Sequence, residues 1–425
     1  MVEGGNGMQT LKLVNAIFMA AFVICYAYQF FYIPVLWLKK EKARTLPAGL
    51  HSYAVLICAR NEAAVIGDLI DSLHAQTYEQ SLIRVFVMAD NCTDETAGIA
   101  RAKGVQVYER WSTEQVGKSY ALQALRQRMK EDYPEGFDGY FVFDADNILK
   151  KNYIEEMNRT FSQGHDLVTS YRNSKNYADN WISAGYALWF LRESRYLNHA
   201  RSLLGTSCAV SGTGFLFSRK VADEIGDWPF HLLTEDLEFT VNQITKGRKI
   251  AFCAEAEFYD EQPVSFLQSW RQRQRWTKGY IQIFAAYWKQ LFGGMLHGSW
   301  SCFDFFMSIM PALVLSLGSL ACNIAICIWG GIAGQDMMIA LYSAGELVRN
   351  MYLTLLAVGL ITTISEWNHI QCGPVLKLGF CLTFPFFMFT YIPIAISAFF
   401  CKVEWKPIAH TVTVGQMQKK QVPVK

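Results

Sequence analysis

The stretch Tyr140-Phe-Val-Phe-Asp-Ala-Asp146 decides how the middle of this chain folds. Four apolar residues followed at once by carboxylates are typical of a parallel strand that is buried on both faces and ends at a polar rim. In an extended segment residues i and i+2 point the same way, so Asp144 and Asp146 can face one ion. Such hard oxygen ligands suit Mg²⁺ or Mn²⁺, although an acidic turn that caps the next helix would also fit.

The same pattern of an apolar strand followed by polar residues recurs upstream. Strands are predicted at residues 53–58, 83–89, 105–109 and 140–143. Helical periodicity lies between them, at 65–76, 94–103 and 118–131. Strands that alternate with helices predict an α/β domain with a parallel sheet, whose ligands bind at the carboxyl ends of the strands. We therefore expect Asn61, Glu62 and Asp90 to share a rim with the two aspartates.

A second acidic cluster, Thr234-Glu235-Asp236, precedes another helical pattern. It could be a simple helix cap, or Asp236 could be a general base. A base beside an ion site is what glycosyl transfer from a nucleotide sugar needs. The ion takes up charge on the leaving diphosphate, and the base removes the proton of the acceptor hydroxyl. In-line attack from the opposite face inverts the anomeric carbon.

Basic residues supply possible phosphate contacts. Lys118 stands at the start of a predicted helix, where it could meet a phosphate together with helix amides or simply be a solvated lysine. The segment Gln272-Arg-Gln-Arg-Trp276 has the composition of a basic amphipathic helix on a membrane surface. In addition, Arg275 can grip a diphosphate and Trp276 can offer a ring face to a sugar.

Composition separates a polar middle from apolar ends. The 425 residues are 52% hydrophobic and only 18% charged, below the usual quarter of a soluble domain. A net charge of +2 does not suit a general polyanion binder, so nucleic acid is not an expected partner. Residues 13–38 carry no charge and are long enough to cross a bilayer. Basic residues follow them, which by the positive-inside rule places the middle domain in the cytoplasm.

The C-terminal third contains three apolar stretches, at 303–333, 337–364 and 374–401. One plus three crossings would put the C-terminus outside, yet residues 402–425 carry five lysines, which favours the inside. We therefore expect two or three crossings here. The second stretch is the best candidate for an interfacial or re-entrant segment, because Glu346 and Arg349 lie in its middle. Their i, i+3 spacing could pair them on one helical face.

These patterns divide the chain into six regions. They are an N-terminal segment (1–12), a transmembrane helix (13–38), a cytoplasmic catalytic domain (50–280), an interfacial helix region (281–302), a transmembrane or channel region (303–401) and a basic tail (402–425).

Four motifs in this order resemble the membrane polysaccharide synthases of glycosyltransferase family 2, which make cellulose, hyaluronan, chitin or poly-N-acetylglucosamine. The motifs are Asp90, the D-x-D at Asp144 and Asp146, the T-E-D that ends at Asp236, and the Q-x-x-R-W from Gln272 to Trp276. The resemblance covers roughly residues 52–280. It implies a Rossmann-like GT-A fold, a UDP-sugar donor (UDP-glucose or UDP-N-acetylglucosamine) and Mg²⁺ or Mn²⁺.

The resemblance also implies roles for individual residues. On the donor side, Asn61, Glu62 and Asp90 line the uridine pocket, Lys118 and Arg275 face the diphosphate, Gln272 closes the site, and Asp144 and Asp146 hold the cation. Asp236 is the base. On the acceptor side lie Trp276, Glu235 and the loop of Ser211 and Gly212.

The leading hypothesis is an inverting, processive synthase that elongates a β-linked glycan and exports it across the plasma membrane. The alternative is a polyprenyl-phosphate sugar transferase, which adds one sugar to a lipid and stops. Such enzymes share the fold and the D-x-D but usually lack Q-x-x-R-W. A transporter or receptor with a nucleotide-binding domain is a third hypothesis. The donor sugar, the linkage and the oligomeric state stay open.

Overall fold

The computed structural model describes residues 4–40, 46–309, 311–332, 337–403, 406–408 and 410–420. Its centre is an eight-stranded sheet in the order β3-β2-β1-β4-β7-β6-β8-β5. The strands are β1 (Tyr53–Ala59), β2 (Ile83–Asp90), β3 (Gln106–Arg110), β4 (Gly139–Asp144), β5 (Ile148–Leu149), β6 (Leu167–Ser174), β7 (Phe215–Ser218) and β8 (Ala251–Asp260).

The half of the sheet that was predicted from sequence is parallel. β1 pairs in parallel with β2 and β4, and β2 pairs in parallel with β3. In this register Cys58 lies between Met88 and Asp144, so the carboxyl ends of three strands meet at one edge. The expected α/β fold is therefore confirmed, and the polar residues that follow these strands start from a common rim.

The other half of the sheet is mixed and was not predicted. β7 pairs antiparallel with β4 and β6, β8 pairs in parallel with β6, and β5 pairs antiparallel with β8. The register of β6 and β8 shifts between Ser170 and Tyr171. These strands extend the rim toward the segments that carry the second acidic cluster.

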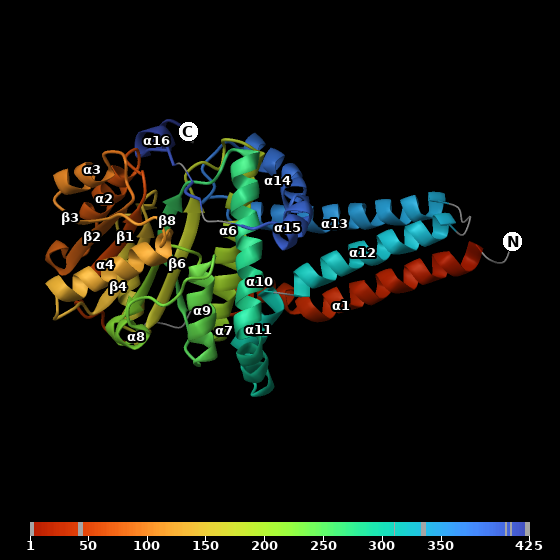
Figure 1. The fold of residues 1–425 in the computed structure, drawn as a ribbon, viewed down its shortest axis with the longest axis horizontal. Helices are drawn as coiled ribbons and strands as arrows, with labels where there is room; N and C mark the ends of the chain where they lie inside the picture. Colours follow the sequence, from red (N-terminus) through yellow and green to blue (C-terminus); the bar gives the residue numbers. More distant parts are fainter. Residues whose placement is uncertain are drawn as a thin grey trace.

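Helices cover both faces of the sheet (Figure 1). They are α2 (Ile66–His74), α3 (Thr96–Ala102), α4 (Lys118–Asp132), α5 (Tyr153–Phe161), α6 (Trp181–Arg192), α7 (Ala200–Leu204), α8 (Arg219–Ile225) and α9 (Glu235–Thr245). Alternation along β1 makes two cores. Val55 belongs to the core that contains the apolar face of α2, whereas Leu56 belongs to the core that contains α4.

The long helix α10 (Phe266–Leu296) lies between the sheet layers and the apolar helices (Figure 1). It continues without a break past residue 280, where we had expected an interfacial region to begin. The apolar helices are α1 (Gly4–Leu38), α11 (Trp300–Ile309), α12 (Pro311–Ile332), α13 (Met337–Ser365), α14 (Pro374–Phe389) and α15 (Tyr391–Phe400). Figure 1 shows α1, α12 and α13 projecting together from one side of the molecule.

Three segments of the described chain are long and apolar enough to cross a membrane: Leu13–Leu38, Ala344–Ser365 and Pro374–Phe400. The last of them is interrupted at Thr390, between α14 and α15. Arg273 of α10 holds this break: its Nη1 donates to Phe387 O at 3.1 Å and to Thr390 Oγ1 at 2.7 Å. The second apolar stretch, which we expected to be interfacial or re-entrant, forms the continuous helix α13. The predicted pair Glu346–Arg349 is present, at 2.5 Å.

The C-terminal tail returns to the catalytic domain and ends in α16 (Val414–Lys420). Thr411 N and Val412 N both donate to Glu261 Oε2, at 2.8 and 2.7 Å. Val414 N donates to Asp68 Oδ2 at 2.7 Å, which fixes the start of α16 beside α2. The tail therefore lies against the same domain that carries the rim.

Candidate active site

A single cavity of about 730 Å³ extends from the rim of the parallel strands to the apolar helices. It brings together all but one of the residues that the sequence singled out: Glu62, Asp90, Lys118, Asp144, Asp146, Ser211, Gly212, Glu235, Asp236, Gln272, Arg275 and Trp276. Residues from four separate motifs, up to 186 positions apart in sequence (276 − 90), thus surround one space.

Asn61 is the exception, since it does not line this cavity. Its backbone is left-handed, with φ of 58°, a conformation that Asn tolerates better than most residues. Its side-chain oxygen accepts a hydrogen bond from Thr93 N at 2.7 Å. In this structure Asn61 joins the loops that follow β1 and β2, and so holds Asp90 and Glu62 in register.

The two aspartates of the D-x-D both face the cavity, but not along an extended strand as we expected. β4 ends at Asp144, and Ala145 and Asp146 form a turn. Lys118 Nζ contacts the carboxylate of Asp144 and also donates to Gly212 O at 2.7 Å. Asp146 Oδ2 accepts from Glu261 N at 2.7 Å. The cation of Lys118 thus links the D-x-D to the loop of Gly212.

Positive charges gather around the buried Asp146. Burial alone would raise its pKa, but the nearby charges of His410 and Lys175 lower the pKa of Asp146 below the usual range of an aspartate. Desolvation opposes the charge of His410, yet Asp146 and Glu62 raise the pKa of His410 to about 10. Both groups are therefore charged at neutral pH.

The donor set of the D-x-D fits a divalent cation in part. Two carboxylates on one cavity wall are hard oxygen ligands, and a nucleotide diphosphate with water would supply the rest of a shell. Among the residues that the structure describes, no three His, Cys, Asp or Glu side chains are grouped so that they could hold a metal by themselves. Asp144 and Asp146 are therefore the residues that would hold a cation that enters with a nucleotide.

The second acidic cluster lies at the start of α9, where helix amides favour negative charge. Burial, followed by the charge of Asp236, raises the pKa of Glu235 to about 7. Burial also raises the pKa of Asp236. Opposite them is Gly212, which has a φ of +80°, and a Cβ there would lie 3.7 Å from Asp236 Oδ2. The missing side chain leaves room above the carboxylate for a ligand.

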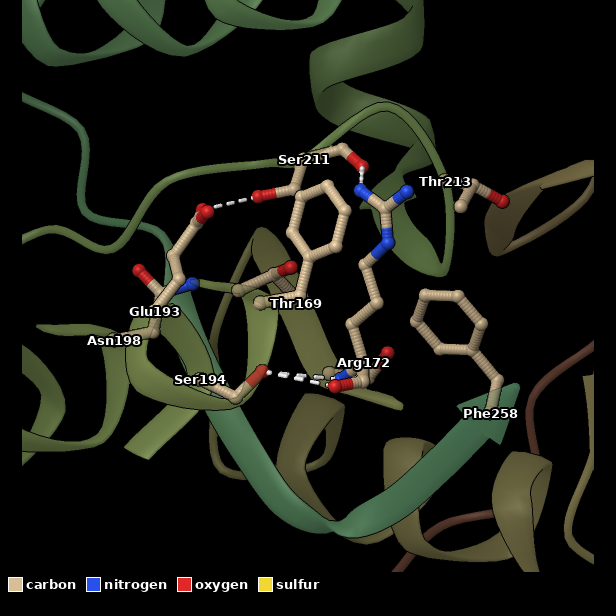
Figure 2. Close-up of a pocket in the computed structure, with 10 residues that line it drawn as sticks. Thr169, Arg172, Glu193, Ser194, Asn198, Ser211, Thr213 and Phe258 are labelled. Carbon is tan, nitrogen blue, oxygen red and sulfur yellow. Dashed lines mark hydrogen bonds between the residues drawn. The ribbon is translucent and has the colours of Figure 1, made fainter. Parts of the chain in front are cut away.

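The loop of Ser211 and Gly212 is held by residues that the sequence did not reveal, and Figure 2 shows two of them, Arg172 and Glu193, beside Ser211. Arg172 Nη1 donates to Ser211 O at 3.0 Å, and Glu193 accepts from the Ser211 hydroxyl. Arg172 is itself held by Asp260, with Nε to Oδ2 at 2.8 Å, and it stacks on the ring of Phe190 at 3.5 Å. No motif marks these residues in sequence, because their partners come from distant strands and helices.

Consecutive arginines of α10 face in different directions. Arg275 lines the cavity, and its Nη1 lies 3.5 Å from Leu233 O. Arg273 is fully buried against α14 and α15, as described above. Gln272 lines the cavity, and its buried Oε1 has no hydrogen-bond partner within the described part of the chain. Trp276 packs edge-on against Tyr186, with ring centroids 5.7 Å apart.

The tail contributes His410, which the sequence analysis also missed. His410 lines the cavity, and its Nδ1 lies 2.9 Å from Glu62 Oε1. A separation of 348 residues hides this contact from any local pattern. The end of the cavity that holds Glu62 and Asp146 is thus partly walled by the last described segment of the chain.

An α/β sheet with carboxylates and cations around one deep cavity at its carboxyl rim defines a sugar transferase of the GT-A type. Residues 51–279 match the family model described as "Glycosyltransferase like family 2". The chain therefore belongs to glycosyltransferase family 2, as the resemblance of the motifs implied.

The names of the relatives that this chain matches indicate different products, a glycolipid in one case and a polysaccharide in the other. A "Beta-monoglucosyldiacylglycerol synthase" of Synechocystis sp. is 25% identical over 241 residues, 55% of this chain and 49% of that protein. A "Poly-beta-1,6-N-acetyl-D-glucosamine synthase" of Staphylococcus aureus is 22% identical over 240 residues, 55% of this chain and 56% of that protein. The chain spans about half of the length of these relatives.

The fold has a counterpart among solved structures. A mannosyltransferase of Pyrobaculum calidifontis, solved with GDP-Man and Mn²⁺, has a TM-score of 0.56 and 16% identity, and it covers 91% of this chain and 99% of its own. The share of this chain that is covered is larger than residues 51–279 alone, and the similarity supports the GT-A assignment of the fold.

Proposed function

We propose that this protein is an inverting glycosyltransferase that moves the sugar of a UDP-sugar to a hydroxyl group of an acceptor at the membrane. One observation carries this proposal. The cavity that holds the D-x-D, Asp236 and Arg275 is also lined by residues of the apolar helices, including Leu317, Leu355 and Ile392. Donor chemistry and membrane access therefore meet in one space.

In the proposed reaction the donor lies at the rim end of the cavity. Glu62 and Asp90 offer carboxylates to ribose or base, and Lys118 and Arg275 offer cations to the diphosphate. Burial raises the pKa of Asp90, while the guanidinium of Arg110, bonded to it at 2.6 Å, acts to lower the pKa again. A divalent cation held at Asp144 and Asp146 would stabilise charge on the leaving diphosphate.

Asp236 is the proposed base. It takes the proton of the acceptor hydroxyl as the hydroxyl oxygen bonds to the anomeric carbon and the bond from that carbon to the diphosphate breaks. Its raised pKa suits this task, because a base is most effective when its pKa is near the operating pH. The space above Gly212 gives the acceptor access to it.

Two acceptors fit this scheme. A growing β-linked glycan, elongated processively and exported, is favoured by the Q-x-x-R-W sequence and by Trp276 on the cavity wall. A membrane lipid that receives one sugar is favoured by the apolar lining at the membrane end, where Leu317, Leu355 and Ile392 would contact acyl or prenyl chains. The lining is the more specific observation, so a lipid acceptor is the better supported of the two.

Product analysis tests this function. The full-length protein in lipid vesicles is incubated with Mn²⁺ and a panel of labelled UDP-sugars, and the label is separated into lipid extract, polymer and free sugar. Label in a lipid that carries one β-linked sugar supports lipid glycosylation, and a polymer supports processive synthesis. Free sugar alone, or no consumption of any UDP-sugar, would refute the proposal.

A further inference from the structure

The membrane end of the cavity holds a cation that the reaction above does not use. Arg192, the last residue of α6, lines the cavity together with Gln29 of α1 and Trp189. Its Nη2 donates to Gln29 Oε1 at 3.0 Å, which places the guanidinium beside an apolar helix that is long enough to cross a membrane. The neighbouring Trp189 ring lies 5.2 Å from the guanidinium carbon.

This guanidinium has spare hydrogen-bonding capacity. An arginine carries five N–H donors, and within the described residues the bond to Gln29 is its one hydrogen bond. No described carboxylate lies within ion-pair distance of Arg192. Arg192 is half-buried, and desolvation of an unpaired charge is costly. Burial lowers the pKa of Arg192 to about 10, so the group still carries its charge at neutral pH.

The nearest charged neighbours are engaged elsewhere. The carboxylate of Glu193 accepts from the Ser211 hydroxyl. The guanidinium of Arg201 is paired with Asp304, with bonds of 2.7 and 3.0 Å. Within the described residues, Arg192 is therefore the cation at this end of the cavity that has no ion-pair contact, and the charge of the adjacent Glu193 helps to keep it protonated.

The backbone changes from an α-helix to a π-helix directly after Arg192. The seven residues Glu193–His199 continue α6 as a π-helix, a rare form that often marks functional sites. Consecutive residues of a helix do not normally share a face, yet Arg192 and Glu193 both line the cavity. Through Glu193 and Ser211, Arg192 is connected to Gly212, which faces Asp236.

We propose that Arg192 binds the phosphate of a membrane phospholipid whose headgroup ends in a hydroxyl, and that it presents this hydroxyl to Asp236. The inference rests on the proposed function and names its acceptor. The acyl chains would lie against Leu317 and Leu355. Because Asp236 serves as a base for a hydroxyl, the phosphate anchors the lipid and is not the nucleophile. The new bond joins the headgroup oxygen to the anomeric carbon, the nucleoside diphosphate leaves, and the proton passes to Asp236.

A binding experiment tests this site without relying on turnover. The full-length protein in uncharged detergent is titrated with dioctanoyl phosphatidylglycerol, with dioctanoylglycerol, which lacks the phosphate, and with glycerol phosphate, which lacks the chains. The variants are Arg192→Gln and, as a matched control, Arg195→Gln. Arg195 lies on the same π-helix but does not line the cavity, and its Nε is 3.5 Å from Glu366 Oε1. UDP titration of each protein reports separately on the donor end.

We expect phosphatidylglycerol to bind the wild type at least tenfold more tightly than either partial ligand. Arg192→Gln should weaken this binding by about tenfold to a hundredfold, as expected for loss of hydrogen bonds to a charged group, and should leave UDP binding unchanged. Arg195→Gln should bind like the wild type.

Three results would overturn the site. They are equal wild-type affinity for phosphatidylglycerol and dioctanoylglycerol, equal affinity for glycerol phosphate and the lipid, or unchanged lipid binding in Arg192→Gln. The first two results are measured on the wild-type protein, so they test the lipid site even if Arg192→Gln does not fold. Lipid binding without UDP binding would instead refute the proposed function and leave the lipid site standing.

Discussion

Glu235 and Asp236 show what single residues contribute and what sequence can say about them. The letters T-E-D suggested a base, because a carboxylate pair ahead of a helix is a recognisable pattern. The sequence could not indicate that both side chains face a buried cavity beside Lys118 and Gly212, and it is burial that raises the pKa of each. The chemical character of a residue is thus set by neighbours that only the fold supplies.

The pH dependence of turnover follows from this pair. A base works only when deprotonated, so with a raised pKa for Asp236 we expect the turnover number to rise with pH, with a midpoint above the usual range of an aspartate. Glu235→Gln removes a neighbouring negative charge, which should lower the pKa of Asp236 and move the rising limb to lower pH. A pH–rate profile that stays in place in Glu235→Gln would contradict the coupling.

Removal of divalent cations tests the D-x-D. We expect EDTA to abolish transfer and Mn²⁺ to restore it, because we propose that the carboxylates of Asp144 and Asp146 on the cavity wall hold a divalent cation. Asp146→Asn should raise the Mn²⁺ concentration needed for half-maximal UDP binding by about tenfold. Asp166→Asn, a change of the same kind at a residue bonded to Ser218 and Lys220 outside the cavity, should behave like the wild type. UDP binding that does not depend on Mn²⁺ would argue against a cation.

At the scale of helices and strands, the elements with a clear pattern of apolar residues were predictable from sequence, and the others were not. β1 and β4 contain unbroken apolar runs, β2 is apolar apart from Arg84 and its last residue Asp90, and the helices between them have regular apolar faces. β7 has four residues, and β8 carries Glu255 and Glu257 within the strand, so neither has a clean pattern. The break at Thr390 falls inside one continuous apolar run, and it depends on Arg273 from a different helix.

The packing of α10 on the loop before α9 gives a prediction at this scale. A Cβ on Gly279 would lie 2.4 Å from Thr234 Oγ1, so Gly279→Ala must displace the residue that precedes Glu235 and Asp236. We expect a loss of about 1–3 kcal/mol in the free energy of unfolding and a lower turnover number with nearly unchanged UDP binding.

Gly293→Ala is the matched control, since it lies in the same helix and a Cβ there meets nothing within 4 Å. It should stabilise α10 by up to about 1 kcal/mol and leave turnover unaltered. Thermal unfolding in detergent and steady-state kinetics measure both effects. Equal behaviour of the two variants would show that α10 does not position the second acidic cluster.

For the molecule as a whole, the contact of the C-terminal tail with the catalytic domain is the feature that could not be predicted from the sequence. The count of apolar stretches and the lysines of the tail gave conflicting answers about the side of the C-terminus. In the structure His410 reaches Glu62, and Lys175 Nζ donates to Val412 O at 3.0 Å. A tail bound to the catalytic domain has to lie on the same side of a membrane as that domain. An even number of crossings after residue 300 satisfies both this contact and the lysines.

Membrane sidedness can be measured directly. We expect a tag fused after Lys425 to lie on the side of the catalytic domain, and a tag before Met1 to lie on the opposite side, because residues 13–38 would cross once. Protease digestion of sealed vesicles of known orientation distinguishes the two tags. If both tags are cleaved from the same side, either the N-terminal crossing or the return of the tail is wrong.

The central claim is that one cavity holds the donor and a base for the acceptor, with Asp236 as that base. UDP binding and sugar transfer by Asp236→Asn, compared with the wild type in the same vesicles, test it most directly. The account predicts UDP affinity within a few-fold of the wild type and a loss of transfer of at least about a hundredfold, since only the proton acceptor is removed. Transfer near the wild-type rate would contradict the account.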